Sequence, residues 1–284
     1  MESTKSIIDI IKDQVQKQES LPVLNPQGME IQQEATKGVP DYKKLSELIR
    51  LDPTLTSQIL KTANSPFYKG LGEVETLKEA AIRLGKDEMV KIIMTMVLKQ
   101  TFKTKVPLIK KYHTALWNHS VSCAVASSWI TKHLAMEDIL SQAFIAGLIH
   151  DLGKLYLLTA LEKIIETQKE TFSPSPQLIE KILTDLHSAL GYELLTKWHL
   201  PEKYRVIARD HHQEESDASN ILLVVVKLAN MVCNKLEINN PKEDLSGIIS
   251  SDEADILGMT EIGIAELEIA LEDFKADNRM GDMN

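Results

Sequence analysis

Apolar residues recur at intervals of three and four along most of the chain, which is the spacing of an amphipathic α-helix. A clear early case begins at Tyr42 and places Leu45 and Ile49 on the same face. Asp52-Pro53 follows, which puts a strong N-cap residue directly before a proline at the first helical position. A second helix is therefore expected to begin there.

The same spacing continues to the end of the chain, and no alternating strand pattern interrupts it. Helices are expected at residues 74–84, 87–102, 112–133, 137–150, 156–169, 177–198 and 201–212, from residue 220, and after a cap at Thr260. Residues 21–28, which contain two prolines, and residues 213–219 are expected to be connecting segments. The pattern therefore predicts an all-α fold.

Composition and charge narrow the class of protein. The chain has 284 residues, 43% of them hydrophobic and 26% charged, as is usual for a soluble globular protein. Its net charge of −9 argues against broad, salt-driven nucleic-acid binding. The most apolar run, 221–232, is interrupted by Lys227 and is shorter than the ~20 residues of a membrane-spanning helix. Cys123 and Cys233 form no paired motif, so a reducing cytoplasm is the expected location.

The most informative stretch is 144–154, an apolar segment that carries His150 and Asp151 side by side and then reaches Gly153. Burying an unpaired imidazole and carboxylate costs several kcal/mol unless they are hydrogen-bonded, ion-paired or bound to a metal. Taken alone, such a pair is more often structural than functional. Its interpretation depends on the partners that the rest of the chain supplies.

Other histidines lie on neighbouring predicted helices or at their ends. The candidate metal ligands are His119, His150, Asp151, His187, His211 and His212. Helical bundles build metal sites from side chains on facing helices, and this donor set suits one or two divalent ions of Mn, Fe, Zn or Ni. Lys154 would offer a positive charge to a phosphate. Each histidine taken alone is more often a surface or core residue. For the whole set, a metal-capable cavity and a structural role are about equally well supported.

These residues also carry a resemblance to the HDOD family, the HD-related output domains of bacterial signalling. The chain has Leu116-Trp-x-His119-Ser, His150-Asp-Leu-Gly-Lys154, His187-x-x-x-Gly191, Trp198-x-Leu-Pro201 and His211-His212. Its first half adds Leu21-Pro22, Asp52-Pro53, Ala63-Asn-Ser65 and Ala81-Ile-x-x-Leu-Gly85. The resemblance spans roughly residues 20 to 235.

The resemblance implies a helical HD-superfamily core with an N-terminal helical subdomain. The expected segments are a leading helix at 1–19, the subdomain at 20–105, the core at 106–240 and a helical extension at 241–284. The six candidate ligands occupy positions that bind metal in catalytic relatives, which include phosphohydrolases and the HD-GYP domains that hydrolyse cyclic di-GMP. Two departures are visible: Asn230 stands where those relatives carry a last Asp, and no Gly-Tyr-Pro loop follows His212.

The leading hypothesis is a signal-transduction output module that acts through signalling proteins and has a metal- or nucleotide-capable cavity. Membrane binding is not expected, and self-association is left open. The alternative is a metal-dependent phosphohydrolase or phosphodiesterase acting on a nucleotide or cyclic dinucleotide, with Asp151 bridging two ions and Lys154 assisting. A purely structural helical scaffold is the third interpretation.

Overall fold

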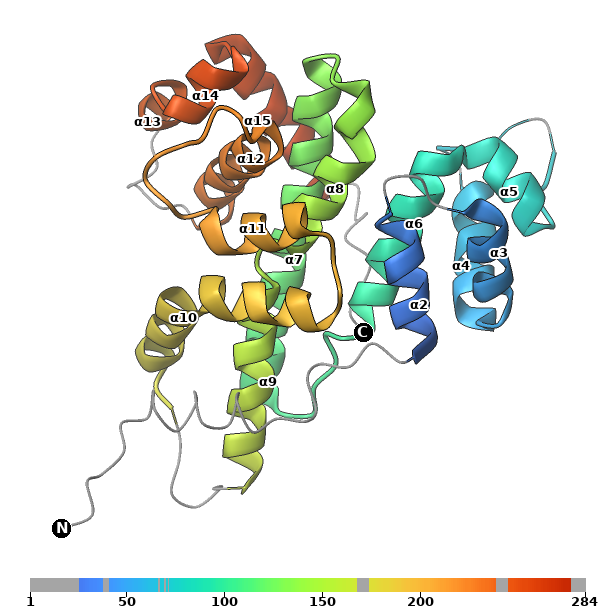
Figure 1. The fold of residues 1–284 in the computed structure, drawn as a ribbon, viewed down its shortest axis with the longest axis horizontal. Coiled ribbons are helices and arrows are strands. Elements are labelled where there is room, and N and C mark those ends of the chain that lie inside the picture. Colours follow the sequence, from blue (N-terminus) through green and yellow to red (C-terminus); the bar gives the residue numbers. More distant parts are fainter. Residues whose placement is uncertain are drawn as a thin grey trace.

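The fold is entirely helical within the part of the chain that the structure describes, which confirms the predicted all-α class (Figure 1). The structure is a computed structural model. It describes residues 26–37, 41–65, 67–68, 70, 72–167, 174–238 and 245–276. The leading helix predicted for residues 1–19 lies outside the described residues.

The first half of the chain forms a layer of short helices. They are α2 (Pro26–Ala35), α3 (Tyr42–Arg50), α4 (Pro53–Ala63), α5 (Leu77–Leu84) and α6 (Lys86–Lys99). The predicted cap at Asp52 is confirmed, because its side chain accepts hydrogen bonds from the first backbone N–H groups of α4. The predicted start of α5 at residue 74 was wrong by three residues, since Thr76 and Glu79 form a capping box there.

A second correction concerns residues 21–28, which were expected to be a connector. Helix α2 begins inside this segment, at Pro26. The physical reason is that proline has no N–H to lose at the first position of a helix and its φ angle already suits one. The helix buries Ile31 and the carboxylate of Glu34 against its neighbours.

The second half forms the main bundle. Its helices are α7 (Pro107–His133), α8 (Leu140–Ile149), α9 (Leu152–Thr167), α10 (Pro176–Lys197), α11 (Glu202–Asp210) and α12 (Ile221–Ile238), with a 3₁₀ turn (Glu137–Ile139) before α8. Helix α7 packs against α8, α9 and α12, and α9 packs against α10. The stretch Glu137–Thr167 is apolar and long enough to cross a membrane, but its most apolar window is 83% buried inside the fold, as in a core helix.

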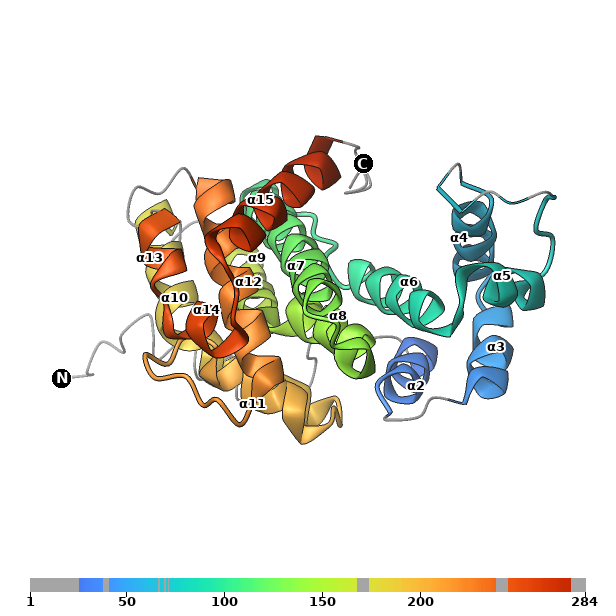
Figure 2. The same ribbon diagram turned by 90° about the horizontal axis from the view of Figure 1, so that it is seen from above.

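Helix α6 joins the two halves. It packs against α2, α4 and α5 on one side and against α8 on the other, and Figure 2 shows it between the N-terminal helices and the bundle. Lys91 on α6 donates a hydrogen bond to Ser128 on α7 at 3.1 Å. The last helices, α13 (Leu245–Ile249), α14 (Asp252–Leu257) and α15 (Glu261–Ala276), cover α12 and α7. The domain boundaries proposed at 105/106 and 240/241 remain predictions.

Two glycines allow unusually close helix packing beside the His-Asp pair. A Cβ atom on Gly153 would lie 1.9 Å from the carbonyl oxygen of His187, and one on Gly147 would lie 2.5 Å from that of Cys123. A Cβ atom does not come so close to a non-bonded atom, so only glycine lets α9 reach α10 and α8 reach α7 at these points. The bundle is thereby drawn together around His150 and Asp151.

Candidate metal centre

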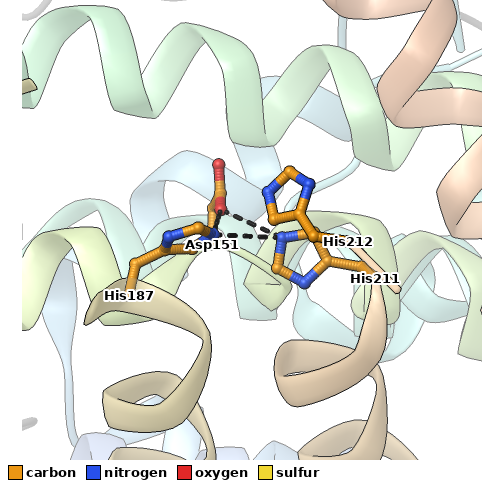
Figure 3. Close-up of side chains that lie close together, drawn as sticks. All are labelled: Asp151, His187, His211 and His212. Atoms are coloured by element: carbon orange, nitrogen blue, oxygen red, sulfur yellow. Dashed lines mark hydrogen bonds and ion pairs between the residues drawn. The ribbon is translucent and has the colours of Figure 1, made fainter. Parts of the chain in front are cut away.

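The bundle brings the predicted ligands together from four separate parts of the chain. His119 lies on α7, His150 ends α8, Asp151 stands between α8 and α9, and His187 lies on α10. His211 and His212 follow α11. All six except His212 are buried. Figure 3 shows Asp151, His187, His211 and His212 pointing toward one another.

Local backbone contacts fix which ring nitrogen of three histidines faces the centre. Nδ1 of His150 lies 2.8 Å from the carbonyl oxygen of Gly147, and Nδ1 of His187 lies 2.7 Å from that of Leu183. Nδ1 of His211 lies 3.1 Å from a carbonyl oxygen of its own helix. A carbonyl only accepts hydrogen bonds, so each Nδ1 carries the proton and each Nε2 presents a lone pair. Metal-binding histidines are oriented in the same way.

The first half of the cluster surrounds Oδ1 of Asp151. This oxygen lies 3.4 Å from Nε2 of His187 and 3.4 Å from Nε2 of His211. The two Nε2 atoms are 3.3 Å apart, and the ring of His212 is centred 5.0 Å from that of His187. Two Nε2 lone pairs facing each other repel unless a proton or a cation lies between them.

The second half surrounds Oδ2 of Asp151. Nε2 of His119 and Nε2 of His150 each lie 3.6 Å from this oxygen. Nζ of Lys154 donates to it at 2.6 Å. One carboxylate therefore faces a pair of imidazoles with each of its oxygens, which is an arrangement that can bridge two ions.

The spacing of these atoms fits a bound transition-metal ion. Two ligand atoms about 2.1 Å from an ion, separated by a tetrahedral angle, are about 3.4 Å apart. Among the described residues, neither Oδ1 of Asp151 nor Nε2 of His150 has a hydrogen-bond partner, although both residues are only 1% exposed. Buried polar atoms are almost always satisfied, so one unsatisfied atom in each half of the cluster indicates that a further group belongs there.

The electrostatics keep the donor atoms ready for a cation. Burial lowers the pKa of His187 to about 4 and holds the pKa of His150 well below its usual value, so both rings are neutral near pH 7. Burial alone would raise the pKa of Asp151, but the positive charge of Lys154 and the surrounding imidazoles hold it well below its usual value. Because His150 and His187 are neutral, we regard Lys154 as the main cause.

Two further residues belong in this description. Asn230 is buried on α12, and its neutral amide oxygen is a weaker metal donor than a carboxylate would be. Cys123 was not among the predicted ligands, yet its Sγ lies 3.5 Å from Nε2 of His119. Its spacing of four residues after His119 on one helix was the signal that could have revealed it.

Comparison with known proteins agrees with this fold. Residues 21–214 match the model of the HDOD domain. The chain therefore belongs to the HDOD family, as its motifs had indicated.

Several solved structures share the fold. An HDOD domain protein of unknown function from Geobacter sulfurreducens has a TM-score of 0.74 and 19% identity, with 96% of this chain and 97% of the other covered. A Shewanella amazonensis protein with the provisional name metal-dependent phosphohydrolase has a TM-score of 0.66 and 16% identity, with 93% and 95% covered. A Marinobacter aquaeolei protein, provisionally named a signal transduction protein, has a TM-score of 0.66 and 17% identity, with 95% and 64% covered.

One relative is similar in sequence over most of this chain. An uncharacterized protein of Treponema pallidum is 25% identical over 247 residues, which make up 84% of this chain and 46% of the relative. The chain thus spans less than half of that curated relative. At such identities the solved structures demonstrate the fold alone, and activity has to be argued from the site.

Proposed function

We propose that this protein is a cytoplasmic bacterial signalling module of the HDOD type, in which a divalent metal bound at the histidine cluster holds the regulatory fold together. The observation that carries the proposal is the convergence of four Nε2 atoms on the two oxygens of Asp151 at 3.4–3.6 Å. Such a cluster supports metal binding better than a structural role, because two of its buried atoms lack hydrogen-bond partners in the described part of the chain.

The residues that would hold the metal divide into two sets. His187, His211 and His212 would bind with Oδ1 of Asp151, and His119 and His150 with Oδ2. The metal would supply positive charge and, where a coordination position stays open, an activated water. The protein supplies the oriented Nε2 lone pairs and the buried, ionised carboxylate. Output would pass to partner signalling proteins through the helices that the site ties together.

Asp151→Asn tests this proposal. Elemental analysis of the wild type should find bound Mn, Fe, Zn or Ni, and the variant should lose most of it because an amide replaces the shared carboxylate. Adding metal at about 100 times its dissociation constant should stabilise the wild type by about 2.7 kcal/mol and leave the variant unchanged. Asp185→Asn, which alters an exposed ion pair on α10, is the matched control. A wild type that takes up no metal would overturn the proposal.

A second function, phosphodiester hydrolysis, is favoured by one observation. Lys154 places an ammonium beside the carboxylate that both halves of the cluster share, where it could also meet a phosphate oxygen. A chromogenic phosphodiester supplied with Mn²⁺ or Fe²⁺ separates the two functions. Metal binding without turnover supports the signalling module. Turnover that Asp151→Asn abolishes would establish the hydrolase instead.

A further inference from the structure

Cys123 lies on α7 one turn after His119, on the side of the cluster that faces Oδ2 of Asp151. We propose that its thiolate is a metal ligand, and that Cys123, His119 and His150 form a soft centre selective for Zn²⁺. This inference deepens the proposed function and rests on it. It assigns to the second half of the cluster a ligand that the HD-type motifs do not contain.

The distances are those of a zinc site. Sγ of Cys123 lies 3.5 Å from Nε2 of His119, and the three donor atoms of Cys123, His119 and His150 all lie within 4.8 Å of one another. For zinc, with a Zn–S distance of about 2.3 Å and a Zn–N distance of about 2.05 Å, a tetrahedral angle puts sulfur and nitrogen about 3.5 Å apart. The two side chains are therefore already placed as neighbouring zinc ligands.

His150 provides a second and independent indication of a ligand. The residue is 1% exposed, and its Nδ1 donates to the carbonyl of Gly147, which leaves the lone pair of Nε2 directed into the cluster. Within the described chain this Nε2 has no hydrogen-bond partner. A buried, oriented and unsatisfied imidazole nitrogen is what a metal ion would complete.

Charge gives a reason for a sulfur ligand at this point. The negative charge of Asp151 is already offset by the ammonium of Lys154, which donates to Oδ2 at 2.6 Å. Binding of Zn²⁺ would form a Zn–S bond, break the S–H bond of Cys123 and release its proton to solvent. The thiolate would then restore one negative charge beside Asp151. Thiolate ligands also shift preference from Mn²⁺ and Mg²⁺ toward Zn²⁺.

The packing of α7 against α8 keeps Cys123 in this position. A Cβ atom on Gly147 would lie 2.5 Å from the carbonyl oxygen of Cys123, so the backbones meet without an intervening side chain. Gly147 also supplies the carbonyl that orients His150. The same close contact therefore positions two of the three proposed ligands.

Cobalt substitution tests the assignment, because a cysteine thiolate bound to Co²⁺ gives a charge-transfer band in the near ultraviolet that nitrogen and oxygen ligands do not. We expect this band in the Co²⁺-loaded wild type. It should disappear in Cys123→Ser and persist in Cys233→Ser, a control that changes the other buried cysteine, on α12. Competition titration should show Zn²⁺ binding weakened at least about tenfold in Cys123→Ser alone.

The wild-type spectrum needs no variant, so the test holds even if Cys123→Ser folds poorly. A cobalt-loaded wild type without the band overturns the cysteine proposal and leaves the proposed function standing. A band lost in Cys233→Ser and kept in Cys123→Ser also overturns it. A wild type that binds neither Co²⁺ nor Zn²⁺ overturns both proposals, which keeps the two failures distinguishable.

Discussion

Glu34 in the N-terminal layer and Asp151 in the bundle are both buried carboxylates, each with a side chain only 1% exposed. The oxygens of Glu34 are satisfied by the backbone N–H of Asp41 at 3.0 Å, Nζ of Lys37 at 2.7 Å and Nζ of Lys44 at 3.3 Å. Oδ1 of Asp151 has no hydrogen-bond partner among the described residues and faces only Nε2 of His187 and Nε2 of His211, each at 3.4 Å. One region completes its carboxylate with its own side chains, and the other leaves an oxygen available.

A third buried carboxylate, Glu253 on α14, behaves like Glu34. It accepts from Nζ of Lys227 at 2.7 Å and from the hydroxyl of Ser216 at 2.6 Å. Lys227 also donates to the carbonyl of Gln213, directly after the two histidines. The fold is thus able to satisfy a buried acid where it needs only stability. The missing hydrogen bond of Asp151 is therefore informative, because the other two buried carboxylates, Glu34 and Glu253, have theirs.

The largest expected effect comes from Gly153→Ala. This substitution changes none of the proposed ligand residues and alters only the distances between them. The added methyl would meet the backbone of His187 and Gly191, so α9 must move from α10 at a cost of about 3 kcal/mol. Chemical denaturation should show this loss, and metal uptake should fall with it because His187 moves away from Asp151.

Gly72→Ala is the matched control for that substitution, since nothing lies within 4 Å of its added methyl. If Gly153→Ala retained normal stability and full metal uptake, positioning by close helix packing would be the wrong explanation of the site.

A smaller effect is expected from Glu253→Gln, which breaks the buried pair with Lys227. The side chain of Lys227 is 6% exposed, and its ammonium would lose its charge partner, which typically costs about 2–3 kcal/mol after its remaining hydrogen bonds are allowed for. Urea denaturation measures the loss. Metal stoichiometry should stay unchanged, because Glu253 completes structure and binds no ion.

For Glu253→Gln the control is Glu266→Gln on α15, where the carboxylate is 55% exposed and lies 3.9 Å from His133. If the two variants had equal free energies of unfolding, the buried pair of Glu253 would contribute no more than an exposed one, and the prediction would be wrong.

The smallest effect is expected from Glu34→Gln. Hydrogen bonds from Lys37 and from the N–H of Asp41 lower the pKa of Glu34 from 4.5 to about 2. A lowered pKa means that the carboxylate adds stability above pH 4.5 and loses that contribution as the pH falls through about 2. Because both lysines are about half exposed, the gain near pH 7 should be only about 1 kcal/mol.

Urea denaturation at pH 7 and at successively lower pH checks this sign. The difference between wild type and Glu34→Gln should narrow as the pH falls below 4.5, whereas Glu47→Gln, at an exposed position of α3, should show no difference at any pH. A gap that widens on acidification would contradict the assigned role of the lysines.

Local chemistry made much of the fold predictable. The apolar period of α3 and the Asp52-Pro53 start of α4 depend on neighbouring residues, and both appear in the structure. The errors arose where two signals competed. Proline at position 26 is compatible with both a connector and a helix start. At α5, the apolar residue Val74 suggested an earlier start, but the capping box of Thr76 sets the start at Leu77.

The candidate site was predictable only in part. Ordered motifs identified His119, His150 and Asp151, because their residue types and spacing are visible along the chain. The contact of Cys123 with His119 and the division of the cluster between the two oxygens of Asp151 are properties of helices packed side by side. Such contacts depend on Gly147 and Gly153, and these glycines are needed only because Cys123 and His187, which are distant in the sequence, pack against them.

Helix α12 has a practical consequence for anyone who cuts this protein into pieces. The family match ends at residue 214, yet α12 begins at Ile221 and packs against α7 with Val224, Val225 and Val226 fully buried. A fragment that stopped at the end of the match would leave the surface of α7 that α12 covers exposed to solvent. The stretch that matches the family model is therefore shorter than the bundle whose core α12 completes.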